Sequence, residues 1–233
     1  MKTISSSIIY KGLYKDLEDE FGYDEAHKLW ALAERVNKHL YEKYSAEDEF
    51  GIANMLFPAA AVYLALQKRQ PDFPAMDMLR AYGTKTGERM RKLIHTVTLL
   101  PGAPYIIWKN IDKISDRASS EELGYTRRGL AVTETTSQVD VLSCPLHDMA
   151  KRMGMPEVCQ TICAMDKVYM TGFRHIQYRR TKSVAEGDDC CDYRLWWDKA
   201  KNRVSADMKQ PSAVVLCDVR GLDIISPQYN NAS

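Results

Sequence analysis

The stretch that decides the fold reads Asp189-Cys190-Cys191-Asp192-Tyr193-Arg194-Leu195-Trp196-Trp197. Its aromatic residues and alternating polarity are typical of a β-strand, in which successive side chains point to opposite faces of the sheet. One face would carry Cys191, Tyr193, Leu195 and Trp197, and the other would carry Cys190, Asp192, Arg194 and Trp196. The first set is more apolar, so we expect Cys191 to face the core. Alternation also means that the vicinal cysteines cannot both point inward, and a disulfide between them would be strained.

The segments around this strand extend the same pattern. Val- and Thr-rich strands are predicted at residues 127–135 and 138–142, and a further strand at 173–182 is joined to the first stretch by a turn at Glu186-Gly187. Between them, Pro145 and Pro156 each suit the first turn of a helix; the first helix ends at Gly154 and the second reaches Met170.

The first half of the chain is predicted to be helical, because apolar residues recur at helical spacing. We expect helices at 24–40, at 47–69 with a bend or restart at Pro58, at 74–99 and at 104–117. The fold class is therefore α+β, with a helical N-terminal half packed on a small antiparallel β-sheet with interspersed helices. We expect a single domain, with a helical layer at 1–120, the sheet and its helices at 121–200, and a C-terminal extension at 201–233.

The composition of the chain limits the classes of function and partner to consider. The chain has 233 residues, 45% of them hydrophobic, and a net charge of +1, so no electrostatic feature predicts a nucleic-acid or membrane partner. The N-terminus lacks the apolar core of a signal peptide, which favours a cytoplasmic location. The six cysteines are then free thiols, metal ligands or catalytic groups rather than structural disulfides. They are Cys144, Cys159, Cys163, Cys190, Cys191 and Cys217.

The predicted helix at 156–170 carries the most unusual face. Cys159, Cys163, Asp166 and Met170 share it at spacings of four, seven and eleven residues. The two thiols alone are compatible with ordinary core packing. A carboxylate on an apolar face needs a partner, which would be an ion pair with Arg179 or Arg180, or a substrate.

A second candidate lies at the predicted helix start after residue 143. Cys144 at a helix N-terminus is expected to have a lowered pKa, and His147 one turn later could serve as its base; a capped helix with a surface histidine explains the pattern equally well. The cysteines and His147 could together hold zinc or an iron–sulfur cluster, but Cys159 and Cys163 do not have the Cys-x2-Cys spacing of common sites. We expect no cofactor and leave a metal as the open alternative.

Five ordered motifs in the second half resemble the L-2-amino-thiazoline-4-carboxylic acid hydrolase family. They are Cys144-Pro145, Gly154-Met155-Pro156-Glu157, Cys163-Ala164-Met165-Asp166, Arg180-Thr181, and Gly187-Asp188-Asp189-Cys190-Cys191-Asp192-Tyr193. Weaker similarity extends upstream through Phe57-Pro58 to Glu20-Phe21-Gly22, and Tyr193 stands where the family commonly has phenylalanine.

The resemblance implies a small-molecule hydrolase that opens a cyclic amidine ring to a carbamoyl-cysteine, with a Cys/Asp/Arg site. In that mechanism Cys191, or Cys163 as second choice, attacks the ring carbon or positions water, and His147 or a second cysteine moves protons. Asp166 binds the amidine nitrogens and Arg180 grips the substrate carboxylate in a bidentate manner. Cys144, Thr181 and Asp192 complete the expected substrate-binding set.

Two other classes of function stay open. One is a non-catalytic domain that senses a ligand, a metal or the redox state through its clustered cysteines, and the other is an interaction module in which the cysteines merely pack. For the hydrolase we expect a small-molecule substrate as partner and leave the formation of a homo-oligomer open.

Overall fold

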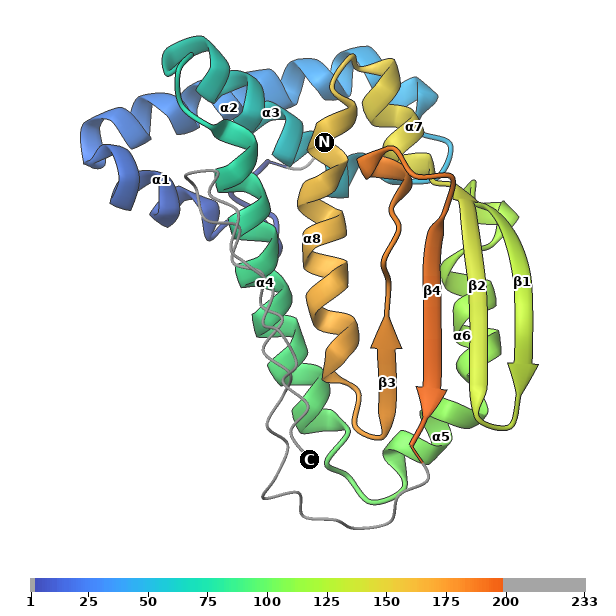
Figure 1. The fold of residues 1–233 in the computed structure, drawn as a ribbon. Coiled ribbons are helices and arrows are strands. Elements are labelled where there is room, and N and C mark those ends of the chain that lie inside the picture. Colours follow the sequence, from blue (N-terminus) through green and yellow to red (C-terminus); the bar gives the residue numbers. More distant parts are fainter. Residues whose placement is uncertain (1–2, 199–233) are drawn as a thin grey trace, which may run out of the picture. The chain divides into compact units, whose positions relative to one another are not determined.

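The computed structural model describes residues 3–198, which form an α+β fold around a four-stranded antiparallel sheet (Figure 1). The strand order is β1-β2-β4-β3. Their bounds are Thr126–Thr133 for β1, Thr136–Ser143 for β2, Ile176–Arg179 for β3 and Cys191–Trp197 for β4. All four predicted strands are present, and the third is shorter than expected because His175 adopts a left-handed φ of 61° just before it. Cys217 and the predicted extension at 201–233 lie outside the described residues.

The register of β4 sorts its side chains as the alternation predicted. Cys191 pairs with Val141 and Tyr193 with Val139, which puts these residues on one face of the sheet. Asp192, paired with Asp140, lies on the other face. Cys190 and Cys191 are both buried but have different neighbours, Asp140 and Asp192 for Cys190 and Cys163 and Arg180 for Cys191. Both thiols are free.

The predicted helices occur in the expected order with corrected ends, and α1 is a further helix that was not predicted. Their bounds are Leu13–Phe21 for α1, Tyr23–Tyr44 for α2, Ala53–Arg69 for α3, Ala75–Val97 for α4, Ala103–Lys109 for α5, Ile111–Ala118 for α6, Pro145–Arg152 for α7 and Gln160–Tyr169 for α8. Short 3-10 turns add η1 at Ser45–Glu47, η2 at Glu121–Leu123, η3 at Pro156–Cys159, η4 at Met170–Gly172 and η5 at Val184–Glu186.

Three predicted helices needed correction. The second begins at Ala53 rather than residue 47, because the Asp48 carboxylate accepts the N–H groups of Ile52 and Ala53 and caps the new start. It runs through Pro58 without a restart. The segment at 104–117 is two helices, since Asn110 leaves helical geometry between α5 and α6. The helix predicted from Pro156 opens and closes with 3-10 turns around α8.

α4 and α8 lie side by side along most of their length (Figure 1). The contact is backbone against backbone at two glycines of α4. A Cβ on Gly83 would overlap the carbonyl oxygen of Thr161, and a Cβ on Gly87 would come within 2.6 Å of that of Met165. Side chains at these positions would force the helices apart, so the close approach depends on glycine.

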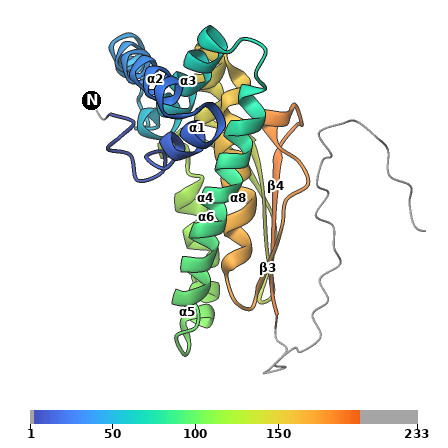
Figure 2. The same ribbon diagram turned by 90° about the vertical axis from the view of Figure 1, so that its left-hand side faces the viewer.

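The helices cover one face of the sheet (Figure 2). The buried side chains of α1 to α3 share one core with those of α7 and α8, whereas Trp108 of α5 and Ile111 of α6 form a smaller core with Ile176 and Leu195 of the sheet. The opposite face of the sheet is polar, and there Asp140 pairs with Arg128 and Arg194. The site therefore has to be sought between α8 and the covered face. None of the helices between residues 3 and 198 combines the length and apolarity needed for a membrane span.

Candidate functional site

The centre of the candidate site is a carboxylate that α8 turns toward the sheet. Asp166 Oδ2 accepts hydrogen bonds from the Tyr193 hydroxyl at 2.7 Å and from Arg180 Nη1 at 2.9 Å. Cys163 stands one turn earlier on the same helix, and Arg180 Nη2 donates to its carbonyl oxygen at 2.9 Å. The sequence left Asp166 with two possible partners, and the ion pair with Arg180 is the one observed.

Arg180 is deeply buried and its first partner is Asp166, so the bidentate grip on a substrate carboxylate stays a prediction from the resemblance. Its side chain is 1% exposed, and Nη1 also donates to the Tyr193 hydroxyl. Burial disfavours the charged form of Arg180. The electrostatic effect of Tyr193, Tyr178 and Asp166 is larger than this cost and holds the pKa of Arg180 above its ordinary value. Among the described residues, Arg180 Nε is buried without a hydrogen-bond partner, and Nη2, which carries two N–H groups, makes one bond, to the Cys163 carbonyl oxygen. Arg180 therefore positions Asp166 and keeps two N–H groups without a protein acceptor, one on Nε and one on Nη2.

Three thiols meet beside this ion pair, and we call Cys144, Cys159 and Cys163 the thiol cluster. Cys159 lies beside each of the other two. Cys159 and the backbone N–H groups at the start of α7 favour the thiolate of Cys144, so the pKa of Cys144 falls to about 7 despite burial. The pKa of Cys163 is lowered by Cys159 and, after the cost of burial, by Arg180. The pKa of Cys159 is raised by its two thiol neighbours and by burial, so Cys159 is the member of the cluster that keeps its proton.

Cys191 joins this region from β4 but has the opposite character. Burial raises its pKa to about 11, although its sulfur accepts the Val184 N–H at 3.3 Å. Reactivity follows the thiolate, so the acidic cysteines are Cys144 and Cys163 and not the first-choice nucleophile of the sequence analysis. The structure thus pairs Asp166 with Arg180 and makes Cys144 and Cys163 more acidic than Cys191, while the choice of nucleophile stays a prediction.

The remaining predicted residues lie at the margin of the site. The His147 backbone N–H approaches Cys144, while its imidazole Nδ1 is buried without a hydrogen-bond partner and its pKa is lowered by burial and by Lys151. Asp192 accepts the N–H groups of Thr181 and Lys182 at 2.7 and 2.6 Å and the Thr181 hydroxyl at 2.7 Å. These bonds fasten the segment that follows Arg180, which gives Asp192 and Thr181 a positioning role.

Tyrosines and one serine complete the site, and the sequence reasoning missed them. Tyr125 lies near Cys144, and Tyr169 near Asp166; burial raises the pKa of both hydroxyls. The Tyr178 hydroxyl is buried without a partner. Ser183, fully buried, lies beside Cys163 and helps to lower the pKa of that thiol. Tyr178 was detectable, since it falls in a predicted strand next to the Arg180-Thr181 motif, whereas the others depend on tertiary contacts.

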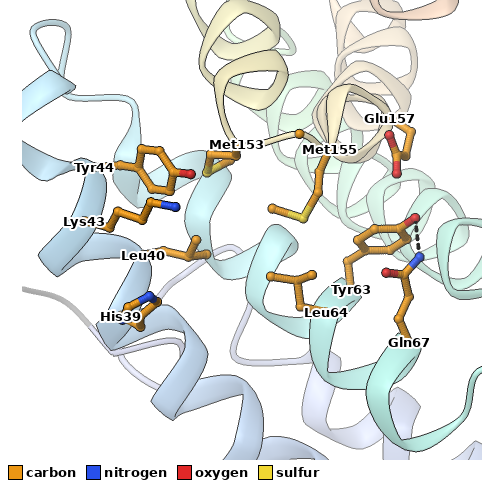
Figure 3. Close-up of a pocket in the computed structure, with 11 residues that line it drawn as sticks. His39, Leu40, Lys43, Tyr44, Tyr63, Leu64, Gln67, Met153, Met155 and Glu157 are labelled. Atoms are coloured by element: carbon orange, nitrogen blue, oxygen red, sulfur yellow. Dashed lines mark hydrogen bonds between the residues drawn. The ribbon is translucent and has the colours of Figure 1, made fainter.

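A separate cavity of about 440 Å³ lies between α2, α3 and the segment after α7 (Figure 3). Leu64 and Met155 supply its apolar lining, and the Tyr63 hydroxyl accepts a hydrogen bond from Gln67 Nε2 at 2.6 Å. None of the predicted site residues lines this cavity. Across residues 3–198, no group of three or more His, Cys, Asp or Glu side chains is placed to hold a metal ion.

The low pKa of Cys144 can be measured directly. We expect its alkylation by iodoacetamide, followed by mass spectrometry of its peptide, to accelerate as pH rises through about 7, because the thiolate is the reacting form. Cys159→Ala removes the S–H donor and should move the midpoint upward, while Cys190→Ala, outside the thiol cluster, should leave it in place. An unchanged midpoint in Cys159→Ala would show that the thiol cluster does not set this pKa.

The sequence matches the model of a known protein family. The family model of L-2-amino-thiazoline-4-carboxylic acid hydrolase matches residues 49–195, which include the thiol cluster, Asp166, Arg180 and Cys191. No curated protein matches the chain. The match spans more than half of the 233 residues. The chain therefore belongs to the L-2-amino-thiazoline-4-carboxylic acid hydrolase family.

Proposed function

We propose that this protein hydrolyses a cyclic amidine of the 2-amino-thiazoline-4-carboxylate type to the corresponding carbamoyl-cysteine. The observation that carries the proposal is that the acidic thiol Cys144 and the carboxylate of Asp166, which is held by an arginine and a tyrosine, both lie near Tyr125. Covalent catalysis on an amidine carbon needs a thiolate near neutral pH and an acceptor for the amidine N–H groups. Membership of a family named for this hydrolysis supports the substrate class.

The reaction would begin at the thiol cluster. The Cys144 thiolate attacks the ring carbon that lies between nitrogen and sulfur, while Asp166 accepts hydrogen bonds from the protonated amidine. The bond from that carbon to the ring sulfur breaks, and the carbon stays on Cys144 as an isothiouronium. Water then adds to this carbon and the Cys144 thiolate leaves again. One proton of the water ends on the ring sulfur, and the other is released because the amidinium charge is lost.

The surrounding residues would support the reaction in three ways: they stabilise the Cys144 thiolate, orient Asp166 and offer donors to the substrate. Cys159 keeps its proton, because its pKa is raised, and donates it as a hydrogen bond whenever Cys144 is a thiolate. Arg180 and Tyr193 fix the Asp166 oxygen that faces them, so that the carboxylate is oriented before the substrate arrives. Arg180 Nε and the hydroxyls of Tyr178 and Ser183 are buried without a partner and would be available to the substrate.

The test uses the purified full chain and 2-amino-thiazoline-4-carboxylate. We expect a new free thiol, detected with a chromogenic disulfide, to appear together with the carbamoyl product, which carries one ¹⁸O when the reaction runs in H₂¹⁸O. Cys190→Ala should retain this rate, because Cys190 lies outside the thiol cluster. If no thiol is released but hydrogen peroxide readily oxidises Cys144, the alternative of a thiol-based sensor gains the support and the hydrolase proposal fails.

A further inference from the structure

A large apolar surface lies where α4 turns into α5, near the end of β4 (Figure 1). We call it the apolar tip, and it consists of Val97, Leu99, Leu100, Tyr105 and Ile106. All five are exposed, and Leu100 and Ile106 each present 63% of their surface. Leu93, one turn earlier on α4, is exposed as well. Monomers seldom expose large apolar side chains in one group, so the apolar tip calls for a partner.

The apolar tip is a defined turn. The Leu100 N–H donates to the Val97 carbonyl, and the Ala103 N–H donates to the Leu100 carbonyl. Gly102 sits between them with a φ of 79°, a conformation that favours glycine. Behind the turn, the buried Trp108 anchors α5 through its indole N–H, which donates to the Glu134 carbonyl at 2.8 Å. The turn and the anchored helix α5 therefore hold the leucines of the apolar tip toward the outside.

The apolar tip itself carries no charged side chain, and exposed cations lie on both sides of it in the sequence. No charged side chain occurs between His95 and Lys109. Beyond this interval stand the exposed cations Lys92, Lys109, Lys113 and Arg117. No ion pair joins any of these four cations to a carboxylate within residues 3–198.

The acidic residues of the same segment are engaged elsewhere. Asp112 accepts the Ser137 hydroxyl at 2.7 Å, and Asp116 pairs with Arg127. The Lys109 ammonium lies over the Tyr105 ring, 4.9 Å from its centroid. The four exposed cations thus outnumber the acidic residues of this segment, since Asp116 is paired with Arg127 and Asp112 alone keeps an uncompensated charge.

We propose that the apolar tip docks on an anionic phospholipid bilayer. Leu99, Leu100 and Ile106 would enter the boundary between headgroups and acyl chains, and the lysines would meet the lipid phosphates. This is the pattern of proteins that lie on a membrane without crossing it, with apolar side chains next to a cationic border. The whole-chain charge of +1 had indicated no membrane partner, because it averages over this local excess.

Charge complementarity favours lipid over a second copy of the chain. In a twofold dimer the same patch appears on both sides, so the unpaired lysines around one apolar tip would face those around the other. Like charges at that distance repel, whereas an anionic bilayer attracts them. The proposal is independent of the proposed hydrolysis, since it uses none of the residues around Asp166.

The test measures sedimentation of the full chain with vesicles. We expect it to bind vesicles of phosphatidylcholine with phosphatidylglycerol more tightly than phosphatidylcholine alone. The double variant Leu100→Glu/Ile106→Glu should weaken partitioning about ten-fold or more. The matched control Leu130→Glu/Val132→Glu changes two exposed apolar residues of β1 and should bind like the wild type. Lys109→Gln should cost about five-fold on anionic vesicles alone.

Three results would overturn the proposal. The first is an absence of binding to anionic vesicles, or equal binding by the tip variant and its control. The second is a lipid-free dimer in analytical ultracentrifugation that Leu100→Glu/Ile106→Glu dissociates, which would assign the apolar tip to a second copy. The third is a sharp fall in the thermal unfolding temperature of the tip variant alone, which would show that the chain itself covers this surface. Turnover of the thiazoline is expected to stay unchanged in both double variants.

Discussion

Replacing Cys144 with alanine is expected to lower kcat for the thiazoline about a thousand-fold or more, because the attacking group is removed. Cys144 is the thiol whose pKa falls to about 7, through Cys159 and the N–H groups at the start of α7. In the wild type, kcat should fall as pH drops through the pKa of Cys144, since protonation of the thiolate removes the nucleophile. Steady-state release of the product thiol, measured from pH 5 to 9, gives both quantities.

Cys191→Ala is the matched comparison for this loss. Its thiol faces the same region, but its pKa of about 11 keeps it protonated, so kcat should stay within a few-fold of the wild type. Circular dichroism should show that both variants fold, since each replaces a small buried side chain by another. Near-normal turnover in Cys144→Ala, with the large loss in Cys191→Ala, would contradict the assignment and restore Cys191 as the nucleophile.

Gly83→Ala is expected to reduce the free energy of unfolding by about 3 kcal/mol. Alanine normally stabilises a helix by about 1 kcal/mol relative to glycine, so the sign of the effect is informative. Here the new Cβ would meet the carbonyl oxygen of Thr161 and the Cβ of Ala164 at 3.3 Å, and a backbone atom cannot rotate away as a side chain can.

Urea unfolding followed by circular dichroism measures this difference. Thr84→Ala is the control, because the neighbouring residue on α4 is exposed and its replacement should change the free energy of unfolding by at most about 0.5 kcal/mol. Equal or higher stability of Gly83→Ala would mean that α4 and α8 are not held as closely as the structure shows. Because α8 carries Cys163 and Asp166, a displaced helix should also reduce turnover.

Much of the fold could be predicted from local patterns. Alternation in the stretch 189–197 gave the strand and its inner face, because a side-chain period of two is a property of the strand alone. Helical spacing likewise placed Cys163 and Asp166 on one face. The ends of elements were less accessible, since the start of α3 depends on a cap from Asp48 and the break at Asn110 has no strong signal in the sequence.

The sequence predicted which residues form the candidate site better than it predicted what each of them does. The sequence brought Asp166 and Arg180 together as one of two alternatives, but it could not show that Arg180 would be buried. The ionisation of the thiols depends on which sulfur Cys159 touches, and Cys144 reaches it from a different helix. Tyr125 and Ser183 contribute through contacts of the same long-range kind, which no local pattern encodes.

The pairing of β4 with β2 has a consequence for how the molecule becomes active. Asp192 and Tyr193 are neighbours in sequence on opposite faces, and the pairs Asp140–Asp192 and Val139–Tyr193 fix which residue turns inward. A slip of one residue would exchange them, leaving a carboxylate in the core and the tyrosine partner of Asp166 in water. A chain trapped with that error would keep its secondary structure and lack its chemistry. Correct strand pairing is therefore required for assembly of the site, and turnover can report on misfolding that spectroscopy of the backbone would overlook.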